Sequence, residues 1–247
     1  MRTLILDIET VGESWSELDN VTQDVLTRWI DRTAKTNTEH ETMLQDIKAS
    51  LGFSPLTGQI VALGVYDVER GEGTVYSVGD ATSTTDTSEG VFLYKWRTEA
   101  ELLKEFWEGV SEYEVVVTFN GRAFDLPFII HRSLALTITP TVDLMRYRYL
   151  TQQSIPYQVD LQDQLTFYGA MSKRPSLHLF CRAYGIESPK IEGVSGDDVA
   201  ELFAQKKFTD IARYNARDLI ATAELYIRWQ THLAPPAFRN DEPSLEF

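Results

Sequence analysis

The sequence of 247 residues has a single cysteine, Cys181, so no disulfide can form within the chain. This cysteine usage fits a reducing compartment, and we expect a cytoplasmic, intracellular protein. No apolar run approaches the ~20 residues that a membrane-spanning helix needs. The N-terminus also lacks a charged head followed by a long apolar segment. The sequence therefore predicts neither a membrane contact nor a signal peptide.

Positive charge is also scarce, because 23 Lys and Arg residues stand against 37 Asp and Glu residues, giving a net charge of −14. A general nucleic-acid binder is expected to be basic, so this balance argues against a broad electrostatic contact with a polyanion. It still permits a local basic groove or a phosphate held through a metal ion. The four histidines show no metal-ligand spacing, and we assign none of them to a metal: His40, His131, His178 and His232.

Strand patterns dominate the first part of the chain, and helical patterns dominate after residue 160. No internal repeat or convincing linker divides the sequence, and 247 residues can bury the core of one large domain. We therefore expect a single α/β domain over residues 1–234 with a mixed five-stranded sheet flanked by helices. Pro235-Pro236 ends the last helical pattern, and we expect a C-terminal tail over 235–247.

The expected strands cover residues 3–8, 59–67, 74–78, 114–119 and 139–144. Between the first two, helical spacing over 14–33 and 36–51 predicts a helical insertion after the first strand, at about residues 13–57. The later helices are expected at 98–113, 126–136, 160–169, 175–185, 196–205 and 208–231. Thr98 and Glu101 have the spacing of a capping box, residues 10–12 are expected to turn, and the polar segment 80–90 predicts a surface loop.

Two carboxylates stand at the end of the first apolar strand pattern, Asp7 and Glu9. Residues two apart on a strand point to the same face. Neighbouring carboxylates repel one another and are costly to desolvate, so a cation is expected between them, and a divalent metal is the simplest candidate. The alternative is that the strand has already ended and that both acids are solvated.

Two further acids, Asp125 and Asp218, stand in sequence contexts that also allow a purely structural role. Asp125 ends the segment Asn120-Gly-Arg-Ala-Phe-Asp, where a helix is expected to begin, and it could be a simple N-cap. Tyr214 and Asp218 are four residues apart and share one helical face with the apolar Leu225. An inward acid needs a partner, which could be a metal or an arginine such as Arg213, Arg217 or Arg122.

Taken together, Asp7-Ile-Glu9, Asn120-x-x-x-Phe-Asp125 and Tyr214-x-x-x-Asp218 resemble the DEDD 3′–5′ exonucleases of the ribonuclease H-like superfamily, in their tyrosine-type branch. More narrowly, the sequence resembles predicted exonucleases related to the proofreading domain of family-B DNA polymerases. The segments that carry this likeness are 119–128, Asp160-Leu-Gln-Asp163, Tyr168-Gly169, 176–186 and Lys190. Asp143 and Asp160 both stand in Val-Asp-Leu contexts, and we favour Asp160 as the family's Asp-Leu element.

The resemblance implies a ribonuclease H-like fold and a catalytic set of Asp7, Glu9, Asp125, Tyr214 and Asp218. Its four acids would hold two divalent metal ions, Mg²⁺ or Mn²⁺, with Asp7 shared, Glu9 and Asp218 completing one site, and Asp125 holding the second. Tyr214 would orient the attacking water, since a phenol is a poor base at neutral pH. Thr10, Asn120 and Phe124 would contact the substrate.

The function that follows from the resemblance is removal of nucleotides from the 3′ end of single-stranded nucleic acid, with DNA favoured over RNA. A 3′–5′ exoribonuclease is the first alternative, because no feature of the sequence distinguishes RNA from DNA by contact with the 2′ hydroxyl. A second is a non-catalytic nucleic-acid-binding or assembly module with the same fold, although the presence of all four acids and the tyrosine argues against it. An endonuclease using the same metals is a third. The sequence identifies no protein partner.

Overall fold

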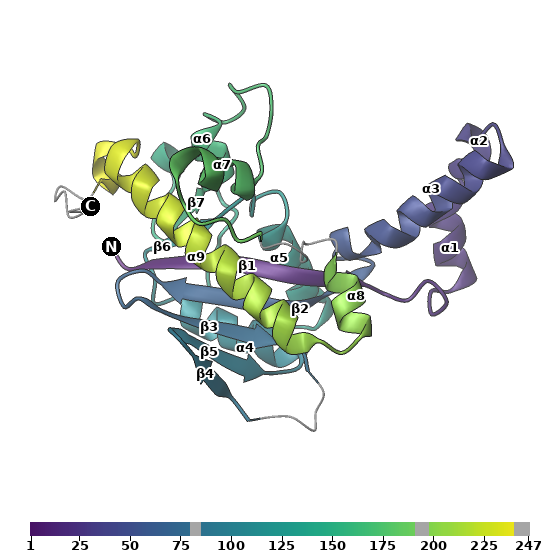
Figure 1. Cartoon of the computed structure of the whole chain (residues 1–247), viewed down its shortest axis with the longest axis horizontal. Helices are drawn as coiled ribbons and strands as arrows, with labels where there is room; N and C mark the ends of the chain where they lie inside the picture. Colours follow the sequence, from purple (N-terminus) through teal and green to yellow (C-terminus); the bar gives the residue numbers. More distant parts are fainter. Residues whose placement is uncertain (80–84, 191–197, 240–247) are drawn as a thin grey trace.

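The computed structural model describes residues 1–79, 85–190 and 198–239. At its centre is a seven-stranded mixed sheet with the strand order β4-β5-β3-β2-β1-β6-β7 (Figure 1). The strands are β1 (Thr3–Gly12), β2 (Gly58–Asp67), β3 (Glu72–Ser77), β4 (Thr87–Glu89), β5 (Phe92–Trp96), β6 (Val115–Thr118) and β7 (Tyr157–Asp160).

The strand directions bring distant parts of the sequence to one edge of the sheet. β1 runs parallel to β6, and β6 runs parallel to β7, whereas β2 runs antiparallel to β1. The carboxyl ends of β1, β6 and β7 therefore lie at the same edge. This edge collects the acids of β1, the segment after β6 and Asp160, and it is the usual place for a site in a sheet with parallel strands.

Helices cover both faces of the sheet. On one face lie α6 (Leu161–Leu165), α7 (Leu177–Tyr184), α8 (Val199–Ala204) and α9 (Phe208–His232), and the long α9 crosses the sheet diagonally (Figure 1). On the other face lie α4 (Glu99–Val110) and α5 (Asp125–Ala135). Each face has its own apolar core, because the side chains of β1 alternate: Ile5 packs toward α9, and Leu4, Leu6 and Ile8 pack toward α4 and α5.

Local sequence signals account for the helix boundaries on the α4 side. Thr98 and Glu101 form the expected capping box at the start of α4. Leu102, Leu103, Phe106 and Trp107 are then buried on one side of that helix, at the spacing of an amphipathic element.

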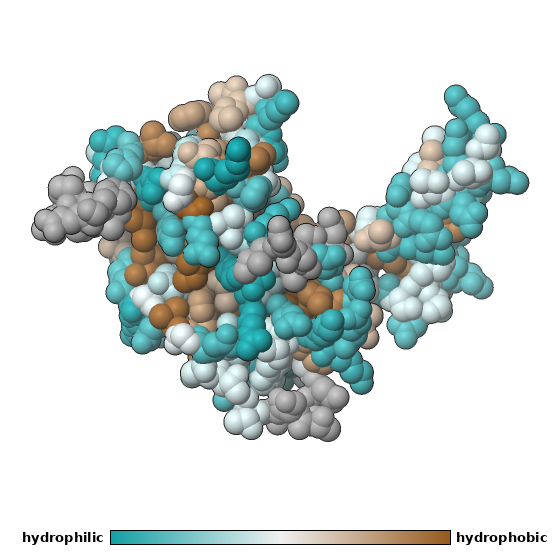
Figure 2. Space-filling model, viewed as in Figure 1, coloured by the Kyte–Doolittle hydropathy of each residue, from teal (hydrophilic) through white to brown (hydrophobic). Residues whose placement is uncertain are grey.

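The expected helical insertion consists of α1 (Asn20–Thr27), α2 (Ile30–Thr33) and α3 (Asn37–Ser50), followed by the 3-10 turn η1 (Leu51–Phe53). It projects away from the sheet (Figure 1), and its visible surface is mainly hydrophilic (Figure 2). Neither α1 nor α3 contributes a buried residue. The insertion therefore joins the body through its root, where Leu51 is buried.

The sheet has two more strands than the five expected, because β4 and β5 extend it beyond β3. The expected strand at 139–144 is wrong, and β7 takes the place beside β6 instead. Residues 139–144 lie against α4, where the Thr141 hydroxyl donates to the Trp107 carbonyl and Leu144 is buried. The expected turn at 10–12 is also wrong, since β1 continues to Gly12 after a register shift between Glu9 and Thr10.

Two further expectations concern segments that the structure describes only in part. Residues 80–84 of the expected 80–90 loop, and 240–247 of the expected tail, lie outside the described residues. The loop expectation is wrong for residues 87–89, which form β4. Within the described part of the tail, Phe238 is buried against Tyr157. No described helix combines the length and apolarity that crossing a membrane requires.

Candidate active site

Asp7 and Glu9 occupy the face of β1 that α9 covers. Each offers a carboxylate oxygen, and these oxygens and one from Asp218 on α9 all lie within 4.8 Å of one another. Glu9 is buried and Asp7 and Asp218 are half-buried. The alternative of two solvated acids beyond the strand is therefore wrong, because β1 continues through both residues.

A tight turn after β6 leads to Asp125. Asn120 has a left-handed backbone (φ 64), and a Cβ on Gly121 would lie 2.4 Å from the Thr118 side chain, so glycine is required there. The carboxylate of Asp160 fixes the turn by accepting hydrogen bonds from the backbone N–H groups of Asn120 and Arg122, both at 3.0 Å. The same carboxylate caps α6.

Asp125 is the first residue of α5, and Phe124 is the N-cap, so the simple N-cap interpretation of Asp125 is wrong. Its Oδ1 instead accepts the backbone N–H of Ile8 at 3.0 Å. Asp125 is 4% exposed and is not one of the three acids whose oxygens converge. Its charge still acts on them, because after burial it is the largest cause that raises the pKa of Asp7.

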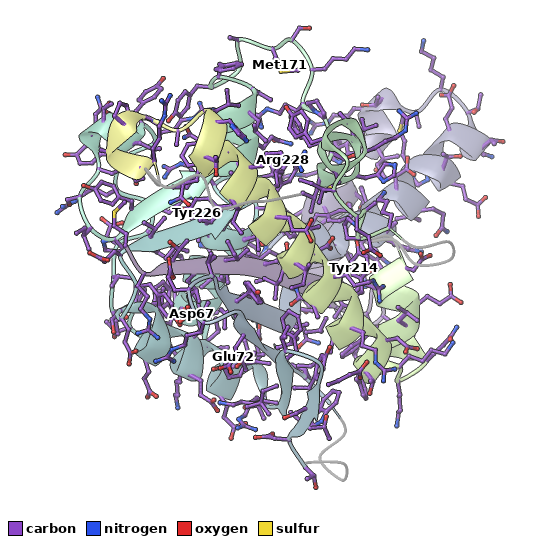
Figure 3. The ribbon with its side chains drawn as sticks, turned by 60° about the vertical axis from the view of Figure 1, so that its left-hand side comes forward. Asp67, Glu72, Met171, Tyr214, Tyr226 and Arg228 are labelled. Carbon is purple, nitrogen blue, oxygen red and sulfur yellow. The ribbon has the colours of Figure 1, made fainter. Side chains whose placement is uncertain are left out.

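Tyr214 and Asp218 lie one turn apart on α9, where Tyr214 is buried against the sheet (Figure 3). The Tyr214 hydroxyl forms a hydrogen bond with the Asp218 carboxylate. None of the suggested arginines forms an ion pair with Asp218 in the described chain. Arg213 pairs with Glu89, and Arg217 donates to the Pro189 carbonyl. Arg122 donates to the carbonyls of the 145–147 segment.

Burial raises the pKa of every acid in this cluster, and repulsion from neighbouring acids adds to the effect at Asp7, Glu9 and Asp125. The pKa values of Asp7 and Glu9 lie well above their ordinary range, first because of burial and then because of the neighbouring acids. Burial raises the pKa of Asp125 to about 7 and that of Asp218 to about 6. Burial also raises the pKa of Tyr214, followed by the charge of Asp218, so this phenol stays protonated at neutral pH.

The residues present fit a divalent metal. Carboxylate oxygens are the donors that Mg²⁺ and Mn²⁺ prefer, and buried acids without a compensating cation retain protons. Arg217 and Lys190 lower the pKa of Asp218, but neither pairs directly with it among the described contacts. The cluster is thus a candidate metal centre at the carboxyl edge of β1.

The three expected substrate contacts lie around this cluster in different situations. The Thr10 hydroxyl donates to the Gly52 carbonyl at 2.7 Å, so it joins β1 to the root of the insertion. Asn120 is half-buried, and its backbone is held by Asp160. The centroid of the Phe124 ring lies 6.4 Å from that of the exposed Phe53, in an edge-on arrangement, and the ring also contacts Phe128. Phe124 therefore packs partly in the core and partly at the surface.

Sequence reasoning missed one buried polar residue of the site, Asn215. Its amide nitrogen donates to Oδ2 of Asp7 at 2.8 Å, and the residue is 0% exposed. The available signal was a polar residue directly after Tyr214 on a helix that packs inward. Gly64 on β2 faces Asn215, and a Cβ there would lie 1.9 Å from its Oδ1. This glycine gave no comparable signal, because it stands among apolar residues in its strand.

The whole fold resembles a solved structure, the family B DNA polymerase from the hyperthermophilic archaeon Pyrobaculum calidifontis. The TM-score is 0.55 and the sequence identity is 17%, over 92% of this chain and 24% of that polymerase. At this identity the likeness concerns the fold, and it confirms the ribonuclease H-like α/β class expected from the sequence.

Among curated proteins, the chain is similar to DNA polymerase 1 from three archaea. Identity is 24% over 149 residues for Sulfurisphaera ohwakuensis, 27% over 150 for Saccharolobus solfataricus and 28% over 154 for Sulfolobus acidocaldarius. Each alignment covers 54% of this chain but only 16% of the polymerase. The chain therefore spans about one sixth of these relatives.

A protein family also matches directly. Residues 57–235 match the family described as predicted 3′–5′ exonucleases related to the exonuclease domain of PolB. The match includes Asp125, Tyr214 and Asp218, while Asp7 and Glu9 lie before it on β1. It spans more than half of the sequence, and the chain belongs to this family of predicted PolB-related 3′–5′ exonucleases.

Proposed function

We propose that the protein is a metal-dependent 3′–5′ exonuclease that removes nucleotides from single-stranded nucleic acid, with DNA preferred over RNA. The observation that carries the proposal is the convergence of carboxylate oxygens from Asp7, Glu9 and Asp218 within 4.8 Å. Membership of a family of predicted exonucleases supports the same reaction class. The preference for DNA rests on similarity to proteins named DNA polymerase 1.

The acids divide into two groups that would hold two ions. Asp7, Glu9 and Asp218 would hold one, and Asp7 with Asp125 would hold the second. Two bound divalent ions would lower the pKa of a water molecule and stabilise the charge on the leaving 3′ oxygen. In the hydrolysis, a water oxygen bonds to phosphorus and the bond from phosphorus to the 3′ oxygen breaks. The products are a nucleoside 5′-monophosphate and a shorter strand with a 3′ hydroxyl.

Tyr214 would contribute as a neutral hydrogen-bonding group. Its raised pKa excludes a role as general base near neutral pH. Its hydroxyl already bonds to the Asp218 carboxylate, which supports a role in orienting both this acid and the attacking water. Its ring lies under the Arg217 guanidinium at 5.7 Å, which restricts the side chain further.

The acidic net charge is compatible with this substrate, because only the last few nucleotides need to be held. Of the basic residues near the site, Arg122 and Arg148 are engaged within the protein, the latter with both oxygens of Asp163. Exposed Lys173, Arg174 and Lys190 are better placed for a phosphate backbone. A local contact of this size would bind with a shallow salt dependence.

The test uses two 5′-labelled single strands of the same sequence, one DNA and one RNA, with Mg²⁺ or Mn²⁺ and then with EDTA. The proposal predicts metal-dependent shortening from the 3′ end, faster for DNA, and none with Asp7→Ala. Faster shortening of RNA would replace the substrate by the exoribonuclease alternative. Binding of either strand without cleavage at any metal concentration would favour the non-catalytic module.

A further inference from the structure

Asn215 is wholly buried, and only the nitrogen of its side-chain amide has a hydrogen-bond partner. It lies on α9 between Tyr214 and Asp218, and its amide nitrogen donates to Oδ2 of Asp7 at 2.8 Å. Its Oδ1 is the one buried side-chain oxygen or nitrogen that lacks a hydrogen-bond partner in the described parts of the chain. An unpaired buried acceptor destabilises the folded protein, so an apolar residue here would favour folding.

The backbone opposite makes room for this contact. Gly64 on β2 pairs directly with Asp7 across the two strands. A Cβ on Gly64 would lie 1.9 Å from Oδ1 of Asn215 and 2.6 Å from the Leu219 side chain. The absence of a side chain at residue 64 therefore lets α9 approach until the amide of Asn215 reaches Asp7.

The chemistry of the donor suits a cation site. The amide donates its hydrogen bond to Asp7 and also lowers the pKa of the neighbouring Glu9. A hydrogen bond to the ionised form favours carboxylate over carboxylic acid, which opposes the effect of burial. A lysine or arginine would do the same but would also compete with a metal for the negative charge. A neutral amide orients the Asp7 carboxylate and leaves its charge available.

We propose that Asn215 is a positioning residue that holds Asp7 in the orientation in which it receives a divalent cation together with Glu9. The inference rests on the proposed function in taking these acids as the metal ligands. Partners that orient a ligand in this way contribute substantially to affinity, and their loss typically weakens metal binding 10–100-fold.

The test measures Mn²⁺ binding by calorimetry and the melting temperature of the metal-free protein. Asn215→Leu removes the donor at similar volume, and Asn215→Ala provides a smaller replacement that tolerates imperfect packing. The matched control is Thr222→Val, at another buried polar position of α9, two turns beyond Asn215. We expect at least a tenfold rise in the Mn²⁺ dissociation constant for both Asn215 variants and none for the control.

The metal-free melting temperature separates positioning from packing. We expect Asn215→Leu to melt at or above the wild-type temperature, because the unpaired acceptor is gone. Wild-type Mn²⁺ affinity in a folded Asn215 variant would overturn the positioning role while leaving the proposed function intact. Absence of Mn²⁺ binding by the wild-type protein would overturn both.

Discussion

The Oδ1 atom of Asp125 accepts the backbone N–H of Ile8 at 3.0 Å, and Ile8 stands between Asp7 and Glu9. This bond ties the first residue of α5 to the middle of the acidic pair on β1. Its two partners are 117 residues apart in sequence. The position of Asp125 relative to the other acids is therefore fixed by the backbone as well as by side-chain packing.

Two substitutions at Asp125 should separate its charge from this bond. Asp125→Asn keeps an oxygen that accepts from Ile8 but removes the charge, so we expect a fall in kcat of at least about 100-fold with little loss of stability. Asp125→Ala also leaves the buried N–H unpaired, which should cost about 1–3 kcal/mol of unfolding free energy. Chemical denaturation beside steady-state kinetics checks both, and equal stability of the two variants would contradict the role of the bond.

The raised pKa values predict how the stability of the metal-free protein depends on pH. The pKa of Asp125 is about 7 in the folded protein, against about 4 when unfolded, so the native state binds more protons between these values. The unfolding free energy contributed by this group is therefore fully present below about pH 4 and is lost as pH rises to about 7.

The measurement compares wild type with Asp125→Asn in EDTA at pH 4.5 and pH 8. Between these values wild type should lose about 3 kcal/mol relative to the variant, because the window from pH 4.5 covers about 2.5 of the three units by which the pKa is shifted. Saturating Mn²⁺ should restore wild-type stability at pH 8. Parallel pH profiles of the two proteins would show that Asp125 does not hold this proton in the folded state.

Tyr214→Phe should slow catalysis without weakening substrate binding. The variant loses the hydroxyl that bonds to Asp218, which should also raise the pKa of this acid further. We expect kcat to fall about 10–100-fold at unchanged KM, with the rising limb of the pH–rate profile displaced upward.

Tyr226→Phe is the matched control for this change, since Tyr226 is also buried on α9 and lies three turns further along (Figure 3). Its hydroxyl bonds to Gln230, away from the acids. We expect this control to alter stability but not kcat. A similar loss of kcat in both variants would assign the effect of Tyr214 to helix packing.

The two Val-Asp-Leu sites make a second matched pair. Asp160 is buried and accepts from the backbone N–H groups of Asn120, Arg122, Gln162 and Asp163, whereas Asp143 is exposed. Asp160→Ala should therefore cost about 3 kcal/mol or more and loosen the turn that leads to Asp125. Asp143→Ala should change stability by less than about 0.5 kcal/mol. Thermal or denaturant unfolding of the two variants tests the assignment.

Periodicity was sufficient to predict which acids face the same side. The two-residue spacing of Asp7 and Glu9 and the four-residue spacing of Tyr214 and Asp218 follow from strand and helix geometry alone. Both pairs lie as these spacings require. The helices α7 and α9 also begin and end near their expected limits, whereas α6 ends at Leu165, four residues before the expected end.

Features that depend on contacts between distant segments were not predictable in this way. The edge strand β7 was misplaced to 139–144, because short apolar segments do not reveal which one pairs with β6. Asn215 was missed because its meaning depends on the empty space at Gly64, and 151 residues separate the two in sequence. The outward extension by β4 and β5 was missed because pairing partners, rather than composition, make them strands.

The most direct test of the central claim compares a linear 5′-labelled single strand with a covalently closed circle of the same sequence. With Mg²⁺ or Mn²⁺, the wild-type protein should shorten the linear strand stepwise from its 3′ end, release nucleoside 5′-monophosphates and leave the circle intact. Asp218→Asn should neither shorten the linear strand nor release nucleotides. Cleavage of the circle would identify an endonuclease, and equal shortening by Asp218→Asn would show that the carboxylate cluster is not the site of hydrolysis.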